Sequence, residues 1–244
     1  MISFLKSKLK LAVSLLVSLV LLSSPIIAKA APNNFGMPPG FNWKAERERQ
    51  LKIFEEAEKK EKAKHKNHEA LLRSSGGDDS DDDEDEKYFP SGTYFGDILV
   101  TKDGSSESSS FFVGHAGLVF DCTQTVESSP KRNGVYLGKS NDWMGWDREK
   151  RRWKKSSVYI LRPMRKWEQT APASDWAFTQ IGKPYNWNYF DRWTMDSYYC
   201  SQLVWRAYFD KLDIDLCPRA WNYVSPGDIL DSGELDIYYS RFED

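Results

Sequence analysis

The 244 residues carry a formal net charge of −2, which gives no general attraction to nucleic acid or to anionic membranes. Residues 88–244 are numerous enough to bury the core of one domain. The composition therefore argues against a nucleic-acid partner and for one globular domain behind a polar leader.

Residues 1–30 predict a secretory signal peptide. Three lysines precede an apolar run at residues 11–27, and Ala28-Lys29-Ala30 offers small residues at the positions that a signal peptidase reads. A retained membrane anchor is the alternative, for which the apolar run is barely long enough. We expect a secreted protein, either extracellular or associated with the cell wall.

Residues 31–87 predict a charged leader. Residues 43–73 are dense in Lys, Arg and Glu and have only a thin apolar stripe, which is typical of a solvated helix ending at Gly76-Gly77. Residues 78–86 form an acidic run, which favours a disordered, self-repelling spacer. A calcium site is the alternative, but the run lacks the alternating ligands of a calcium loop. Contact with the cell surface through this leader stays open.

Residues 88–244 predict an α+β domain. Short strands followed by helices, without regular strand–helix alternation, favour an antiparallel sheet packed against helices. A very short connection near residues 121–122 predicts a hairpin. The expected strands are residues 96–100, 111–120, 123–128, 158–161 and 237–240, and the expected helices are 174–181 and 200–212.

His115 and Cys200 are the candidate reactive residues. His115 lies in an expected strand near two glycines, and glycine in a strand often marks a close approach. Cys200 lies in the first turn of an expected helix, where the helix dipole and free N–H groups favour the thiolate. A neighbouring imidazolium would make that thiolate a strong nucleophile. The alternatives are a core histidine and a buried structural thiol.

A histidine base needs a third group to orient its ring. Asp121 lies six residues from His115 on the same strand, about 20 Å away at the usual strand rise. Glu127 is better placed, because the hairpin folds its strand back toward His115. The face to which Glu127 points depends on the strand register, so a solvated carboxylate at the hairpin edge is the alternative.

The chain has three cysteines, Cys122, Cys200 and Cys217. Export permits a disulfide, and an odd number leaves at least one thiol outside any intramolecular pair. If Cys122 pairs with Cys217, Cys200 is the free thiol. The spacing of these residues does not establish that pairing.

Several segments together resemble the permuted NlpC-type, papain-like amidases of the YiiX kind, which are related to the lecithin:retinol acyltransferase-like proteins. The histidine strand precedes the cysteine helix here, as in that group. The segments are Gly96-Asp97-Ile98, Gly114-His115-Ala116-Gly117-Leu118-Val119, Thr125-Val126-Glu127, Gly182-Lys183-Pro184-Tyr185, Tyr199-Cys200-Ser201-Gln202-Leu203-Val204-Trp205 and Ser225-Pro226-Gly227-Asp228-Ile229.

The resemblance implies a circularly permuted papain-like fold over the mature domain. It implies that Cys200 is the nucleophile, His115 the base and Glu127 the acidic residue that orients the base. The charged leader is not part of the resemblance.

The resemblance also suggests Tyr185 as a residue that helps to bind the oxyanion, with Tyr198 and Tyr199 as rivals. Gln202 is a departure, because many relatives have Glu at that position. The aromatic residues between Tyr185 and Cys200 are either packing or a platform for a sugar, peptide or acyl chain.

These observations predict a secreted cysteine hydrolase that cleaves an amide bond through a thioester intermediate. Cell-wall peptide is the leading substrate class, by analogy with the NlpC-type enzymes. A lipid amidase or acyltransferase is one alternative. A non-catalytic module that binds a cell-wall or amino-acid ligand is another. The chemistry needs no cofactor or metal, and no ligand spacing suggests one.

Overall fold

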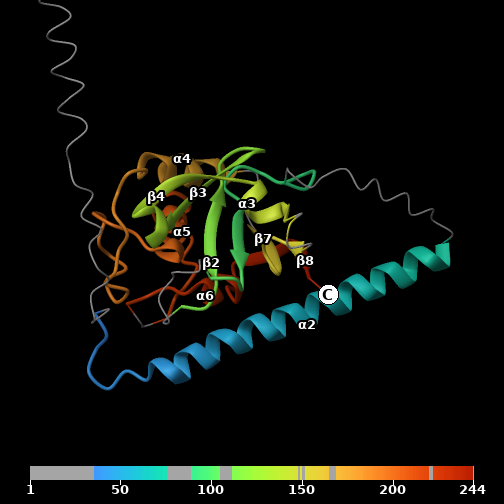
Figure 1. Ribbon diagram of the computed structural model, residues 1–244, viewed down its shortest axis with the longest axis horizontal. Helices are drawn as coiled ribbons and strands as arrows, with labels where there is room; N and C mark the ends of the chain where they lie inside the picture. The colour runs from blue at the N-terminus through green and yellow to red at the C-terminus, as the bar shows by residue number, and fades with distance from the viewer. Residues whose placement is uncertain are drawn as a thin grey trace, which may run out of the picture. The chain divides into compact units, whose positions relative to one another are not determined.

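The protein is described by a computed structural model that covers residues 36–75, 89–104, 112–147, 149, 152–164, 169–219 and 222–243 (Figure 1). The predicted signal peptide and the acidic run lie outside these residues. Within them, no helix is both long and apolar enough to cross a membrane.

An antiparallel sheet organises the domain, with strand order β4-β3-β2-β1-β7-β8. The antiparallel arrangement that the sequence predicted is confirmed. A small second sheet pairs β5 with β6. The strands are β1 (Ile98–Thr101), β2 (His115–Val119), β3 (Gln124–Ser129), β4 (Gly134–Lys139), β5 (Trp146–Asp147), β6 (Arg152–Trp153), β7 (Ser157–Pro163) and β8 (Leu235–Phe242).

Helices pack on both faces of the sheet. Figure 1 shows α5 on one side of β2 and α3 on the other. Burial of apolar side chains on the two faces supplies the main stabilising force, about 1.5–3 kcal/mol for each large side chain. The helices are α2 (Trp43–Ser75), α3 (Asn141–Met144), α4 (Ala171–Thr179), α5 (Cys200–Leu212) and α6 (Pro226–Leu230), with a 3-10 turn at η1 (Pro130–Arg132).

The alternation of side chains along β2 separates two cores. Ala116 and Leu118 face the core that α4 and α5 cover. Val119 belongs to the opposite core, which contains Trp143 and Met144 of α3. His115 and Gly117 share the face of Val119, so the histidine lies on the side of the sheet that α3 covers.

Strand β2 is shorter than the sequence predicted, because it begins at His115 rather than at residue 111. Gly114 adopts φ +89°, a conformation that interrupts an extended strand. A Cβ at Gly114 would lie 2.3 Å from the carbonyl oxygen of Thr101, so only glycine fits. The glycine next to the histidine therefore ends the loop and fixes the first residue of the strand.

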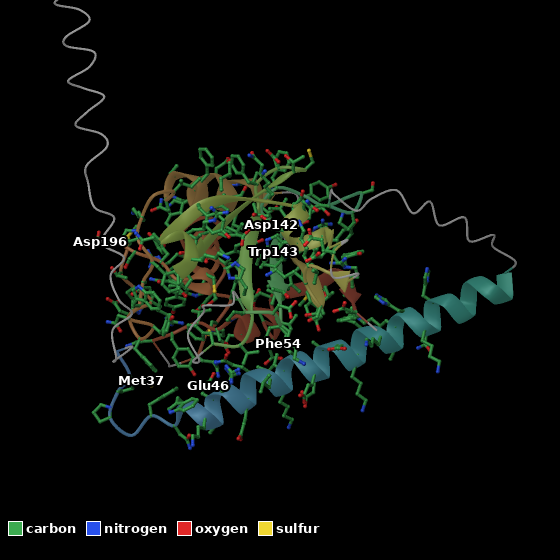
Figure 2. The ribbon with its side chains drawn as sticks, viewed as in Figure 1. Met37, Glu46, Phe54, Asp142, Trp143 and Asp196 are labelled. Atoms are coloured by element: carbon green, nitrogen blue, oxygen red, sulfur yellow. The ribbon has the colours of Figure 1, made fainter. Side chains whose placement is uncertain are left out.

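The leader helix α2 packs on the domain along part of its length, whereas the sequence predicted a solvated helix. Gln50 and Phe54 are fully buried. Gln50 Oε1 accepts a hydrogen bond of 2.8 Å from the backbone N–H of Val113. Phe54, labelled in Figure 2, lies on the side of α2 that faces the domain. The thin apolar stripe of the sequence is thus a docking face.

No disulfide links the cysteines. Cys122 is exposed, whereas Cys200 and Cys217 are buried, and all three are free. The pairing of Cys122 with Cys217 that the sequence left open is therefore not formed. The Cys217 sulfur instead lies 3.9 Å from the carbonyl oxygen of Tyr223.

Candidate active site

Cys200 is the first residue of α5, at the position where the sequence predicted a helix start. Tyr199 before it is extended (φ −90°, ψ 168°), so the chain turns into the helix at the thiol. The free backbone N–H groups and the positive end of the helix dipole surround the sulfur. This setting favours a thiolate at the tip of a rigid helix.

His115 lies close enough to the Cys200 thiol for each side chain to shift the pKa of the other. The Nε2 atom of His115 is 2.7 Å from Glu127 Oε2. Because Nε2 faces the carboxylate, Nδ1 is the ring nitrogen left for the sulfur. The backbone N–H of Ala116 also contacts the sulfur. The structure therefore brings the predicted Cys200, His115 and Glu127 together in one chain of contacts.

The strand register explains the position of Glu127. Its Cα pairs with that of Gly117, two residues beyond His115 on the same face of the sheet. The alternative of a solvated edge carboxylate does not hold, because Glu127 is only 4% exposed. Asp121 instead accepts hydrogen bonds from the N–H and hydroxyl of Thr123.

The Glu127 carboxylate accepts hydrogen bonds from several side chains. The donors are His115 Nε2 at 2.7 Å, Thr125 Oγ1 at 2.5 Å, Trp143 Nε1 at 2.9 Å and Tyr136 Oη at 3.1 Å. The Trp143 ring also stacks on the imidazole, with 5.5 Å between ring centroids. These contacts hold both the carboxylate and the imidazole in one orientation.

Two glycines make room for this carboxylate. A Cβ at Gly117 would lie 2.9 Å from Glu127 Cγ and 3.3 Å from the Trp143 ring. A Cβ at Gly138 would lie 2.3 Å from Glu127 Oε1 and 2.4 Å from Thr125 Oγ1. Any side chain at either position would displace the carboxylate or its partners.

The buried contacts shift the pKa values of the three groups. Burial alone would lower the pKa of His115, but hydrogen bonds to Cys200 and Glu127 outweigh it and raise that pKa from 6.5 to about 9. Burial would raise the pKa of Glu127, but His115, Thr125 and Trp143 lower it to about 2. The result is an imidazolium held beside an ionised carboxylate.

The pKa of the Cys200 thiol is lowered as well. Burial opposes this shift, but the hydrogen bond and charge of His115 outweigh it, with help from the backbone N–H of Ala116. A lowered thiol pKa beside a raised imidazole pKa favours the thiolate–imidazolium pair at neutral pH.

Tyr185 lies in a buried aromatic cluster close to the thiol. Burial raises the pKa of its phenol well above 10.0, and the nearby Tyr189 and Cys200 raise it further. The hydroxyl is therefore a neutral donor. Tyr198 Oη donates to a glutamine oxygen at 3.3 Å, whereas Tyr199 Oη accepts from a backbone N–H at 3.1 Å and keeps its own proton to donate.

Gln202 connects the start of α5 to the preceding loop. Its Oε1 accepts from the N–H of Tyr199 at 3.1 Å and from Asn186 Nδ2 at 2.9 Å. Its Nε2 donates to the carbonyl oxygens of Asp191 and Thr194 at 3.3 and 3.2 Å. A glutamate could not make the last two bonds. Glutamine at this position is thus a structural adaptation of the loop.

Sequence reasoning missed three partners of Glu127. Thr125 carried a usable signal, because it lies two residues from Glu127 and hence on the same strand face. Tyr136 lies opposite Glu127 on β4, a strand that the sequence did not predict. Trp143 gave no signal beyond being one of many aromatic residues. Among the described residues, no group of three or more His, Cys, Asp or Glu side chains is placed to hold a metal ion.

The fold and the site together define a permuted papain-like protein, in which the histidine strand precedes the cysteine helix. A family model described as "Permuted papain-like amidase enzyme, YaeF/YiiX, C92 family" matches residues 96–220, just over half of the chain. The chain belongs to this family, which confirms the resemblance seen in the sequence and assigns it at family level to the cysteine amidases and peptidases.

The chain is also similar to a solved structure in fold. It is the crystal structure of the metalloprotein yiiX from Escherichia coli O157:H7, with 20% sequence identity and a TM-score of 0.46. The similarity covers 61% of this chain and 98% of that chain. No curated protein matches the chain.

Proposed function

We propose that this protein is an exported cysteine hydrolase that cleaves an amide bond in cell-wall peptides, with Cys200, His115 and Glu127 as its triad. The observation that carries the proposal is the buried His115 ring, which lies 2.7 Å from the Glu127 carboxylate and close enough to the Cys200 thiol to lower its pKa. Membership of an amidase family supports the bond type.

The first half of the reaction forms the thioester. The Cys200 thiolate attacks the amide carbonyl carbon, a C–S bond forms, and the carbonyl oxygen becomes an oxyanion. Backbone N–H groups at the start of α5 and the Tyr185 hydroxyl stabilise that charge. The C–N bond then breaks while the His115 imidazolium gives its proton to the leaving amine.

The second half of the reaction regenerates the thiol. Neutral His115 takes a proton from water, and the resulting hydroxide attacks the thioester carbon. The C–S bond breaks, the carboxylic acid leaves, and the thiolate again pairs with the imidazolium. Glu127 stays ionised throughout and keeps the ring in the orientation that faces the sulfur.

Cell-wall peptide is the proposed substrate class because residues 1–30 have the composition of a signal peptide and the related NlpC-type fold suggests peptide amides. A lipid amidase or acyltransferase is the second candidate. It is favoured by the apolar aromatic residues that surround Tyr185, which suit an acyl chain. A non-catalytic binding module on the same fold would need neither the lowered thiol pKa nor the triad.

The test compares wild type with Cys200→Ala on peptidoglycan fragments and on vesicles that contain acylated amides, with products identified by mass. Cys122→Ala is the matched control, because Cys122 is an exposed cysteine. We expect new fragment masses with wild type and with Cys122→Ala, and none with Cys200→Ala. Release of fatty acid alone would favour the lipid enzyme, and equal results for wild type and Cys200→Ala on both substrates would overturn the hydrolase.

A further inference from the structure

The proposed nucleophile is nearly enclosed in the described chain. Cys200 is 3% exposed and His115 is 4% exposed. A hydrolase must bring a substrate carbonyl to the sulfur, with room for groups on both sides of the scissile bond. The elements that surround Cys200 and His115 therefore determine whether a substrate can reach the sulfur.

An aromatic cluster adjoins the pair. The cluster is close in sequence to both proposed catalytic residues, since Tyr199 directly precedes Cys200 and Phe112 lies three residues before His115. Its rings contact one another at 4.7 Å (Phe112 to Tyr189) and 5.3 Å (Phe112 to Tyr199). The buried members are Phe112, Tyr185, Tyr189, Tyr199 and Tyr223, and Trp187 and Phe190 pack against them partly buried.

The beginning of the leader covers this aromatic cluster. Met37 and Phe41 pack against it. The Phe41 ring meets Phe190 edge-on at 4.9 Å and Tyr223 at 5.8 Å. Residues 36–41 are thus an apolar piece of an otherwise charged leader, and two of them pack on the aromatic cluster that includes Tyr199, the residue before Cys200.

The next turns of the leader hold the segment that enters the histidine strand. Gln50 Oε1 accepts from the N–H of Val113 at 2.8 Å, and the Phe54 ring fills the space that a side chain at Gly114 would need. Arg49 forms an ion pair of 2.8 Å with Asp228, although its side chain is about a third exposed. Figure 2 shows Met37, Glu46 and Phe54 spaced along this stretch of the leader.

The family match begins at residue 96, so these leader residues lie outside the part of the chain that the family model describes. The helix is also polar over most of its surface, with Lys52 and Glu56 exposed on its outer side. Its apolar contacts with the domain are confined to one face, and an element on the surface can separate from a domain more readily than a helix enclosed on all sides.

We propose that residues 36–54 are an inhibitory strap, which keeps the site closed in the full chain and opens it when the strap is displaced or removed. The strap places Met37 and Phe41 on the aromatic cluster where an apolar group of the substrate would bind. The strap inhibits an enzyme only if the proposed function is correct, so the inference rests on that function. Whether the strap covers the site is tested separately, by labelling of the Cys200 thiol without any substrate.

The experiment measures the rate at which iodoacetamide labels Cys200 in the full chain, read by peptide mass. The double variant Met37→Ala/Phe41→Ala should label at least about tenfold faster than wild type, because it loses two apolar anchors of the strap. Trp43→Ala is the matched control, since Trp43 is an exposed aromatic residue beside the strap anchors, and its rate should equal that of wild type. Labelling of the buried Cys217 reports general unfolding and should not change.

An unchanged Cys200 rate in the double variant overturns the strap, as does an increase shared equally by Cys217. If the double variant does not fold, Arg49→Gln serves instead, because it removes the partly exposed ion pairs with Glu46 and Asp228 and leaves the apolar anchors in place. That variant should label Cys200 faster than wild type by a smaller factor, and an unchanged rate in a folded Arg49→Gln protein also overturns the strap.

The failure of the strap and the failure of the hydrolase give different results. Faster Cys200 labelling without cleavage of any peptide or lipid amide by the double variant retains the strap and overturns the hydrolase. Cleavage that is equally fast in wild type and in the double variant, with unchanged labelling, retains the hydrolase and overturns the strap.

Discussion

Replacing Glu127 by glutamine should disable His115 while leaving the shape of the site intact. The amide has one accepting oxygen and one donating NH₂ in place of two accepting oxygens. Trp143 Nε1 can only donate, and it lies 2.9 Å from Oε1 of Glu127. The amide oxygen must therefore take the Oε1 position, and the NH₂ must face His115 Nε2 across 2.7 Å.

That orientation fixes the wrong tautomer of the imidazole. Nε2 of His115 must accept from the amide, so the proton of neutral His115 moves to Nδ1. Nδ1 then donates toward Cys200 and cannot take its proton. The imidazolium form of His115 is destabilised as well, because its Nε2 proton would face the NH₂ group, which is also a donor. In the serine protease triad, the corresponding carboxylate-to-amide change lowers kcat about 10⁴-fold for the same reason.

The contacts of His115 give the size of the stabilisation of its imidazolium form. The rise in the pKa of His115 from 6.5 to about 9 corresponds to about 3 kcal/mol at 1.36 kcal/mol per pH unit. Cys200 and Glu127 share that stabilisation. Loss of the carboxylate removes part of that stabilisation, so the pKa of His115 falls and the Cys200 thiol titrates at a higher pH. Amide hydrolysis should fall by about 10³- to 10⁴-fold.

The assay follows iodoacetamide labelling of Cys200 across pH and needs no substrate. Tyr136→Phe is the matched control, because it removes one donor at 3.1 Å and keeps the Glu127 carboxylate. We expect the labelling midpoint of this control to move by less than about half a pH unit. A Glu127→Gln protein with the wild-type midpoint would refute the claim that the carboxylate holds the ion pair.

Three further outcomes follow from the same contacts. Gly138→Ala should displace the Glu127 carboxylate and slow thiol labelling, because its Cβ would lie 2.3 Å from Oε1. Gly233→Ala is the control and should label at the wild-type rate, because no atom lies within 4 Å of its Cβ. Equal labelling rates in the two variants would contradict the role of Gly138. Gln202→Glu should lower the free energy of unfolding in urea by about 2–3 kcal/mol, because a buried carboxylate cannot donate to the two loop carbonyls, and unchanged stability would contradict that role. Hydrolysis should decline as the pH rises through about 9, where His115 loses the proton for the leaving group, and activity that persists at full rate well above that pH would exclude His115 as the acid.

The positions of Cys200 and His115 in the fold could be predicted because each residue is specified by its local sequence. Helical spacing places Cys200 at a helix start, and the adjacent glycine marks the place of His115. Glu127 also followed from local sequence, since a short hairpin brings its strand alongside β2. The order of histidine before cysteine then identified the permuted fold, which the family match confirms.

The surroundings of the carboxylate could not be predicted in the same way. Trp143 belongs to a four-residue helix that lies over the sheet, and its contact with Glu127 depends on the path of the chain after β4. Strand β4 itself was missed, because Gly134 and Gly138 weaken its strand pattern. Both glycines are required by close approach, Gly134 to the backbone of Lys183 and Pro184, and Gly138 to the Glu127 carboxylate.

The position of His115 at the end of a strand explains how the site forms across a sheet. Cys200 begins a helix that packs on one face of the sheet, whereas Glu127 lies on the opposite face under Trp143. A histidine in the middle of β2 would be confined to one face. Because the turn at Gly114 makes His115 the first residue of β2, its ring lies at the end of the strand, near both the thiol and the carboxylate. The leader helix packs on the same turn, because Phe54 lies against Gly114. Displacing the leader would therefore free the turn that places His115 between the Cys200 thiol and the Glu127 carboxylate.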